Sequence, residues 1–309
     1  RQQTAAAQGA TVSGNTVSNI TTTTGTFIGI EYAYSAGSVN DNTITGISGG
    51  GTVSCITAGN SSTVGTQNVY NNIINTVSSS GASLVTGIQS LASGTGNISN
   101  VYQNKICDLS GSNAGSTVFG ITVTAGKTTN VFNNLIGNLT GPNATGTDAI
   151  RGISVTNTTT TSDNNISFNT IYLNATGAGN FGSSGIYHTT STTATTSNLV
   201  LRSNIIYNIS TPAGTGITAA YRRSSTTLTN FGAASNNNLF YAGTPGAATL
   251  IFYDGTNSDQ TLSAYKARVS SRDASSVTED LTTAPTFLST TCGSSNFLHI
   301  STSVATQIE

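Results

Sequence analysis

Residues 101–106 read Val101-Tyr102-Gln103-Asn104-Lys105-Ile106, and this phrase decides the fold because it recurs along the whole chain. Each copy has an apolar residue, two variable positions, an asparagine, one variable position and a large apolar residue. The asparagines of the eight copies are Asn15, Asn42, Asn72, Asn104, Asn134, Asn169, Asn204 and Asn238, the last in a degenerate copy. Successive copies stand 27 to 35 residues apart, and an internal period of this length is typical of a solenoid.

A second feature returns midway between the asparagines, in most periods as a Gly-Ile pair. The residues in this place are Gly29-Ile30, Cys55-Ile56, Gly87-Ile88, Gly120-Ile121, Gly152-Ile153, Gly185-Ile186, Gly216-Ile217 and Leu250-Ile251. Apolar residues alternate around the pairs, as at Phe119, Ile121 and Val123, and a period of two predicts half-buried strands rather than helices. Runs of Ser, Thr, Gly and Asn between the two features predict turns.

These two features predict an all-β fold, a right-handed parallel β-helix of about eight coils with a short helix and strand pieces at its C-terminal end. Equivalent strands would stack about 4.8 Å apart and bury the column of Val, Ile and Leu. The stacked asparagines would form a ladder of amide hydrogen bonds, and Asn also tolerates the left-handed backbone of a sharp corner. A second, partial column stands four residues before the first and consists of Asn68, Asn100, Asn130 and Asn165.

The pattern changes near residue 243. We assign residues 1–242 to the coils, and residues 243–309 to a C-terminal coil, a short helix and a closing segment of the same domain. Residues 261–269 predict the helix, which we expect to lie across the last coils and cover part of the open sheet edge. Residues 285–288 and 296–300 predict short strands. No initiator Met and no capping helix precede the first coil, so we expect more protein upstream.

Composition narrows the classes of function. Only 7% of the residues are charged and the net charge is −1, so no basic patch for nucleic acid is expected. The sequence contains no apolar run of 18 residues, so we expect no membrane-spanning helix. Of three cysteines, Cys55 and Cys107 are interpreted as small packing residues rather than a disulfide. No His or Cys cluster has zinc spacing, and we expect no metal and no cofactor.

Four segments near the C-terminus resemble a known group of proteins. They are residues 238–241, 252–259, 284–289 and 296–300. They are similar to the closing section of secreted right-handed parallel β-helix repeat proteins of the Bacteroidetes cell surface, which are substrates of type IX secretion. The resemblance implies an extracellular or cell-surface location, and it transfers no catalytic residue.

Right-handed β-helices also include polysaccharide lyases and glycoside hydrolases of the pectin-lyase-like class, so an enzyme is the alternative hypothesis. Such sites need paired carboxylates, or bound calcium with an Arg or Lys base. The best constellation in this chain is Asp148, Arg151, Tyr187, His188 and Arg222, from three consecutive coils. His188 has the parity of the inward-facing Ile186, however, and a buried histidine with scattered solubilising charges explains the group better than a catalytic site.

A binding surface is the other functional hypothesis. The position after the first apolar residue of the phrase places Tyr70, Tyr102 and Phe132 one above another, facing outward. Stacked aromatic residues suit sugar rings or a protein partner, although they also occur as a cross-strand stack under a neighbouring loop or domain. The position after the asparagine contains the apolar residues Ile73, Leu135, Ile205 and Leu239, which would favour lateral association if exposed. Ice binding is disfavoured because the outward positions after the Gly-Ile pairs are neither flat nor uniform.

The sequence therefore predicts a structural or adhesive segment of a large secreted or cell-surface bacterial protein, with no catalysis. The expected partners are a polysaccharide or cell-surface glycan, neighbouring domains, or copies of the same protein. No catalytic, cofactor-binding or metal-binding residue is assigned.

Overall fold

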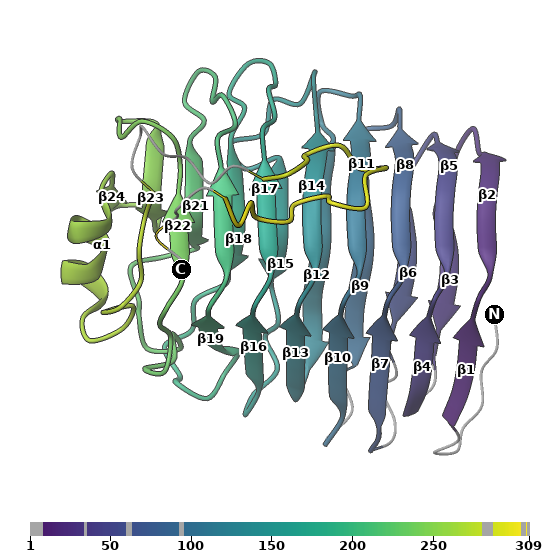
Figure 1. Cartoon of the computed structure of the whole chain (residues 1–309), viewed down its shortest axis with the longest axis horizontal. Coiled ribbons are helices and arrows are strands. Elements are labelled where there is room, and N and C mark those ends of the chain that lie inside the picture. Colours follow the sequence, from purple (N-terminus) through teal and green to yellow (C-terminus); the bar gives the residue numbers. More distant parts are fainter. Residues whose placement is uncertain are drawn as a thin grey trace.

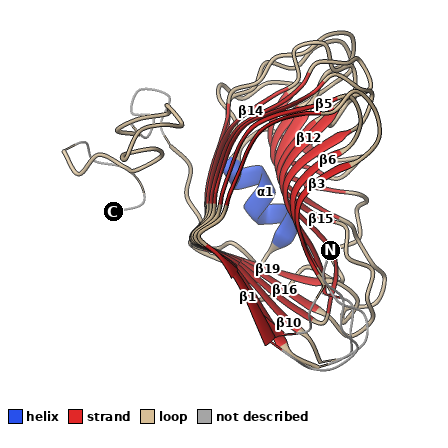
Figure 2. Cartoon of the chain, turned by 90° about the vertical axis from the view of Figure 1, so that its right-hand side faces the viewer, coloured by secondary structure: helices blue, strands red, loops and turns tan. Residues whose placement is uncertain are grey.

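The computed structural model describes residues 9–33, 36–59, 64–92, 96–279, 287–303 and 307. Within these residues the predicted parallel β-helix is confirmed: seven complete turns of three strands are followed by an incomplete eighth (Figure 1). Viewed from the N-terminal end, the chain passes clockwise from sheet to sheet as it recedes, so the helix is right-handed (Figure 2). One short α-helix, α1, follows the last strand in the described part of the chain.

Each turn contributes one strand to each of three sheets. The β1–β19 sheet contains β1 (Gly9–Ser13), β4 (Ala36–Asn40), β7 (Thr66–Tyr70), β10 (Ile98–Tyr102), β13 (Thr128–Phe132), β16 (Asp163–Ser167) and β19 (Asn198–Arg202). The β2–β22 sheet contains β2 (Thr16–Thr21), β5 (Thr43–Gly49), β8 (Ile73–Ser79), β11 (Lys105–Gly111), β14 (Leu135–Thr140), β17 (Thr170–Leu173), β20 (Ile205–Asn208) and β22 (Leu239–Tyr241). The β3–β24 sheet contains β3 (Phe27–Tyr32), β6 (Val53–Ala58), β9 (Leu84–Ala92), β12 (Thr117–Gly126), β15 (Ile150–Val155), β18 (Ser183–His188), β21 (Thr218–Arg223), β23 (Thr249–Tyr253) and β24 (Ser258–Asp259).

The two apolar positions of the repeated phrase form continuous buried columns. Val101 pairs in register with Val69 and Val131, and Ile106 pairs with Ile74 and Ile136. These side chains are almost completely excluded from solvent. Because the asparagine between them lies at the corner joining the β1–β19 sheet to the β2–β22 sheet, one six-residue phrase positions two core columns and a corner.

The asparagines of the phrase are hydrogen-bonded from coil to coil. In all seven steps from Asn15 to Asn238, Nδ2 donates to Oδ1 of the next asparagine at 2.9–3.0 Å. The backbone N–H of each donor residue reaches the same oxygen at 3.0–3.1 Å. The ladder ends on the carboxylate of Asp273, which accepts from Asn238 at 2.8 Å. Buried amides therefore satisfy the backbone of the corner along the whole rod.

The left-handed backbone of the corner lies one residue earlier than predicted. The residue before each asparagine has φ between +51° and +68°, and these residues are Gly14, Asp41, Asn71, Gln103, Asn133, Phe168, Ser203 and Asn237. The ladder asparagines themselves are free to turn their amides inward, because the preceding residue makes the bend. Most members of the corner set are small or polar, as this conformation favours.

The register of the β3–β24 sheet corrects the last two Gly-Ile assignments. Ile186 pairs with Tyr221, and Tyr221 pairs with Phe252, so the equivalent residues are not Gly216-Ile217 or Leu250-Ile251. Gly216-Ile217 lies immediately before β21. The repeat fails here because the last coils fill the core with aromatic rings, which pack against Tyr265 of α1.

The glycine column of this sheet lets neighbouring coils approach closely. A Cβ atom on Gly120 would lie 2.6 Å from the carbonyl oxygen of Gly152 and 2.6 Å from Cγ2 of Ile136. We expect Gly120→Ala to lower the free energy of unfolding by about 1–3 kcal/mol, because the coils must separate to make room. Gly146→Ala is the control, since its nearest neighbour lies at 3.6 Å and the residue is exposed. Equal urea midpoints for the two variants would contradict this explanation of the column.

The predicted helix is confirmed as α1 (Leu262–Val269), which begins after the N-cap Thr261. Tyr265 and Val269 are buried, and Tyr265 packs on Phe240 and Phe252. The helix thus covers the C-terminal end of the hydrophobic core, within the outline of the coils seen along the rod (Figure 2). The Tyr265 hydroxyl also donates to Asp273, so α1 is attached to the end of the asparagine ladder.

The segment 287–303, here named the C-terminal strap, runs back along the outside of the β2–β22 sheet instead of ending the rod (Figures 1 and 2). The two predicted strand pieces are joined by an isolated bridge between Phe287 and Ile300, and a second bridge joins Ser289, just after the first piece, to Phe297. Pro285 and Thr286 of the first piece lie outside the described residues. The strap is bound to the sheet by Lys105, which donates to the carbonyl of Ser294 at 2.8 Å.

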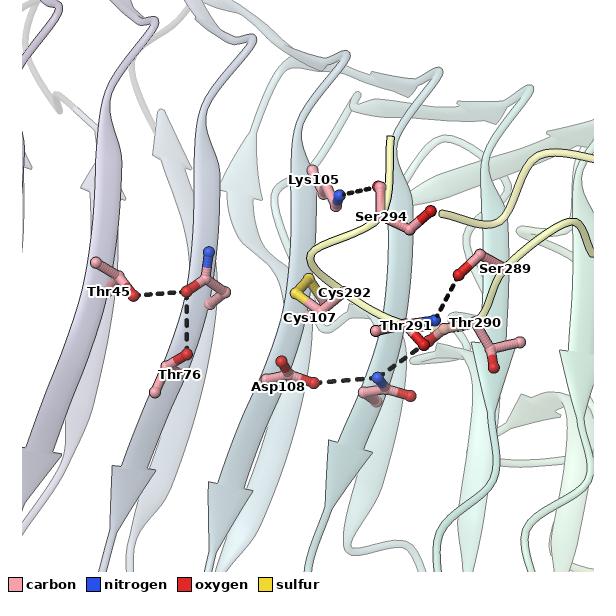
Figure 3. Close-up of a disulfide and its surroundings, with 12 residues drawn as sticks. Thr45, Thr76, Lys105, Cys107, Asp108, Ser289, Thr290, Thr291, Cys292 and Ser294 are labelled. Carbon is pink, nitrogen blue, oxygen red and sulfur yellow. Dashed lines mark hydrogen bonds between the residues drawn. A yellow bond between two sulfur atoms is a disulfide. The ribbon is translucent and has the colours of Figure 1, made fainter. Parts of the chain in front are cut away.

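A disulfide between Cys107 and Cys292 joins the strap to β11 (Figure 3). The interpretation of Cys107 as a packing residue was therefore wrong. Its side chain belongs to the outer face of the sheet, where Gly137 on the next strand leaves room for Phe297 and Leu298. Cys55 is a buried free thiol, as predicted, and burial raises its pKa to about 12.

Candidate functional site

The outer face of the β1–β19 sheet carries the predicted aromatic column. Tyr70, Tyr102 and Phe132 are half-buried and alternate along their strands with inward-facing valines. Their ring centroids are 4.9 and 4.8 Å apart and the rings are within 7° of parallel. The spacing equals the distance between neighbouring strands, so the stack follows directly from the register.

This stacking limits what the column can bind. Each inner ring face is covered by the next ring, and the ring edges remain for contact with a ligand. Burial and the neighbouring Tyr70 raise the pKa of the Tyr102 hydroxyl, which keeps it protonated as a hydrogen-bond donor. The stack ends at Phe132, because the next residue in register is Ser167 and the one after it is Arg202.

A second amide ladder runs beside the aromatic column. Asn100 donates to Asn68, Asn130 to Asn100 and Asn165 to Asn130, with Nδ2–Oδ1 distances of 2.8–2.9 Å. The next residue in register is Val200, so no amide of the following coil reaches Oδ1 of Asn165. This oxygen is an open hydrogen-bond acceptor at the end of the ladder.

The amide ladder ends in a groove at the C-terminal end of the same face, and the aromatic column ends one coil before this groove. The groove has a volume of about 800 Å³ and is bordered by β16, β19, the turn at 233–237 and Ser271. Asn165, Ser167 and Phe168 line it from β16 and the corner that follows, and Arg202 lines it from β19, next to Ser167 in register. Its size lies within the range of small-molecule binding sites.

Phe168 is unusual among the corner residues. It has φ = +56° and its side chain is 60% exposed to solvent. The corner position is otherwise glycine or polar, and a bulky residue with positive φ is strained. Exposing the apolar ring to water is also unfavourable, so neither the stability nor the solubility of the protein explains Phe168. Strain of this kind concentrates at functional sites.

Arg202 supplies the charge of the groove. Its Nε atom donates to the carbonyl of Ala234 at 2.9 Å, which fixes the guanidinium at the groove wall. Among the described residues, no carboxylate forms an ion pair with it, and Arg202 is the charged residue among those that line the groove. The Nη atoms are therefore available for a bound anion.

The constellation proposed for catalysis is brought together only in part. Asp148, Arg151, Tyr187 and Arg222 line a cavity of about 260 Å³ on the outer face of the β3–β24 sheet. Asp148 accepts from Arg151 at 2.8 Å and from the Ser184 hydroxyl at 2.6 Å, and Arg222 lies at 3.6 Å.

The Arg151 guanidinium lies 3.6 Å from the ring centre of Tyr187. These contacts occupy both oxygens of Asp148, and Asp148 is the one carboxylate among the residues lining this cavity. The arrangement matches a structural ion pair under a cation–π contact better than a pair of carboxylates for acid–base catalysis.

His188 points inward, as its parity predicted, and is completely buried. The Arg223 guanidinium lies 2.8 Å from Nδ1, and the carbonyl of Ser197 lies 2.9 Å from Nε2. Burial first, and then the charge of Arg223, lower the pKa of His188 well below 6.5, while the Ser197 carbonyl acts in the opposite direction. The histidine is thus a neutral core residue.

This environment predicts a pH dependence of stability. Above pH 6.5 the histidine is neutral in both states, but below it the unfolded chain takes up a proton that the folded chain does not. We expect the free energy of unfolding to fall by about 1.4 kcal/mol per pH unit as the pH drops from 6.5 towards 5. Urea unfolding at pH 7.5, 6.5 and 5.5 measures this pH dependence. The variant His188→Gln should lose the part of it that the histidine contributes. Identical slopes for both proteins would contradict the assignment.

The apolar column proposed for lateral association is largely covered by the chain's own C-terminal strap. Leu135 packs in the cluster of Cys107, Cys292, Phe297 and Leu298. Ile205 and Leu239 pack with aromatic side chains of the same sheet face and with Phe287 of the strap; the aromatic side chains are Tyr172, Tyr207 and Tyr241. Ile73, which lies beyond these clusters, is 42% exposed.

Sequence reasoning missed three features of these outer faces. Tyr207 stacks on Tyr172 and Tyr241 at 5.8 and 4.4 Å, and the regular spacing of these tyrosines was a usable signal. Arg202 continues the outward column of Phe132 and Ser167, but the repeat did not indicate that it forms a groove with Phe168 and the turn at 233–237.

No helix in the described ranges is long and apolar enough to cross a membrane. The same part of the chain contains no group of three His, Cys, Asp or Glu residues placed to hold a metal ion. Comparisons of the chain with protein-family models, with curated proteins and with solved structures find no match.

Proposed function

We propose that this chain is a rigid adhesive segment of a secreted or cell-surface protein, and that the outer face of its β1–β19 sheet binds a glycan. The observation that carries the proposal is the continuity of this face. A row of aromatic rings and a row of amides run side by side along the rod, and the amide row ends at Asn165 in the groove. Aromatic edges, amides and hydroxyls are the groups that contact sugars, and a stiff rod holds them in a fixed register.

Two observations support an extracellular location. The Cys107–Cys292 disulfide is of a kind that persists in oxidising compartments. The sequence also resembles secreted β-helix proteins of Bacteroidetes, so export by the type IX route to the surface of such a cell is part of the proposal.

The alternative function is a polysaccharide lyase or hydrolase acting at the Asp148 cavity. The observation in its favour is one carboxylate held between Arg151 and Arg222 in a solvent-accessible hollow. The adhesive function is preferred because Asp148 is already fully paired and its cavity is one third the size of the groove.

The test is co-sedimentation of the purified chain with insoluble neutral and acidic polysaccharides at physiological salt. We expect retention on at least one polysaccharide, and reduced retention for Tyr70→Ser/Tyr102→Ser/Phe132→Ser. Serine already occupies this column at Ser167, so the coils are expected to tolerate it. If the chain stays in the supernatant with every polysaccharide, the adhesive function is contradicted.

A further inference from the structure

We propose that the groove at the end of the β1–β19 sheet is a binding site for a uronic acid unit of an acidic polysaccharide, with Arg202 holding the carboxylate. This inference rests on the proposed function, and it names the ligand class and the residues. Asn165 belongs to the second asparagine column, but the sequence pattern gave no binding role to Phe168 or Arg202, because the turn at 233–237 that completes the groove breaks the repeat.

The groove carries a single positive charge. Its lining has one cationic side chain, and the contact of Arg202 Nε with the carbonyl of Ala234 leaves the Nη atoms for a ligand. A guanidinium presents two parallel N–H groups that match a carboxylate, and here it is oriented before the ligand arrives. A single arginine is too little for nucleic acid, which requires a row of cations.

The groove also combines an aromatic face with an unused acceptor. Phe168 is exposed and has a strained backbone, and it lines the groove together with Asn165, whose Oδ1 atom ends the outward amide ladder and has no donor among the described residues. A pyranose ring has an apolar face of C–H groups and a rim of hydroxyls. Phe168 would contact that face, while Asn165 and Ser167 would accept from or donate to the hydroxyls.

The experiment compares two ligands that differ at the carboxyl group, a short oligogalacturonate and its neutral methyl ester, titrated calorimetrically against the purified chain. We expect the acid to bind about ten times more tightly than the ester, since a charge-assisted hydrogen bond is worth at least that factor. Arg202→Gln should lower affinity for the acid about tenfold and leave affinity for the ester unchanged. Lys266→Gln, which removes a cation from α1 on another part of the surface, is the charge-matched control.

Phe168→Ser should weaken the acid and the ester equally, because it removes the platform and keeps the charge. Serine is the corner residue at the equivalent Ser203, so this variant is expected to fold and to be somewhat more stable. Equal binding of acid and ester, with no effect of Arg202→Gln, would overturn the site. If the chain binds neither oligosaccharide yet is retained on other polysaccharides, the site is wrong and the adhesive function stands. If nothing is retained in either assay, the adhesive function itself fails.

Discussion

Replacing Asn104 with leucine is expected to lower the free energy of unfolding by about 3–5 kcal/mol. The substitution leaves the carbonyls of Val69 and Tyr102 without their donor, and the backbone N–H of Asn72 without its acceptor. Each buried polar group left unpaired costs about 1–3 kcal/mol. These groups lie between stacked coils, so a neighbouring side chain cannot replace the lost amide.

The matched control is Asn100→Leu on the same coil. Asn100 belongs to the outward ladder and is half-buried, so water can replace its hydrogen bonds and the expected loss is below about 1 kcal/mol. Urea unfolding of the two variants and the parent chain gives the comparison. Equal losses at both positions would mean that the inner ladder does not hold the corner together.

Replacing Cys107 with serine is expected to cost about 2–5 kcal/mol, because the disulfide closes a loop of 185 residues in the unfolded chain. The same change frees the C-terminal strap from β11, so proteolysis should cut the strap before the coils. We expect an earlier thermal transition and early cleavage between residues 287 and 303.

The control for this variant is chemical reduction. Reductant should bring the parent chain to the stability of Cys107→Ser and leave the variant unchanged, because Cys55 is free and buried in both. A parent chain whose urea midpoint is the same with and without reductant would contradict a stabilising disulfide.

The repeated phrase was enough to predict the solenoid, because stacking in register brings identical residues together. Val101 lies over Val69 and Asn104 over Asn72 for the same reason. The outward direction of Tyr70, Tyr102 and Phe132 followed from the parity of one strand. The repeated phrase could not predict contacts between a coil and a segment outside the repeat.

The remaining features come from such contacts. Cys107 and Cys292 are 185 residues apart, and nothing in the spacing of the coils indicates that the chain turns back along its own outer face. The Gly-Ile pattern fails near Tyr221, where aromatic side chains pack against Tyr265 of α1, and the repeat contains no information about this helix. Phe168 and Arg202 became a candidate site only when the turn at 233–237 formed the other wall of the groove.

Whether the chain binds glycans without cleaving them can be measured from the length of the polymer after binding. The chain is incubated with soluble neutral and acidic polysaccharides, and the size of each polymer and its new reducing or unsaturated ends are measured together with the bound fraction. We expect bound polymer of unchanged length. Shortened polymer, with cleavage abolished by Asp148→Asn, would contradict it and assign the chain to the enzymes.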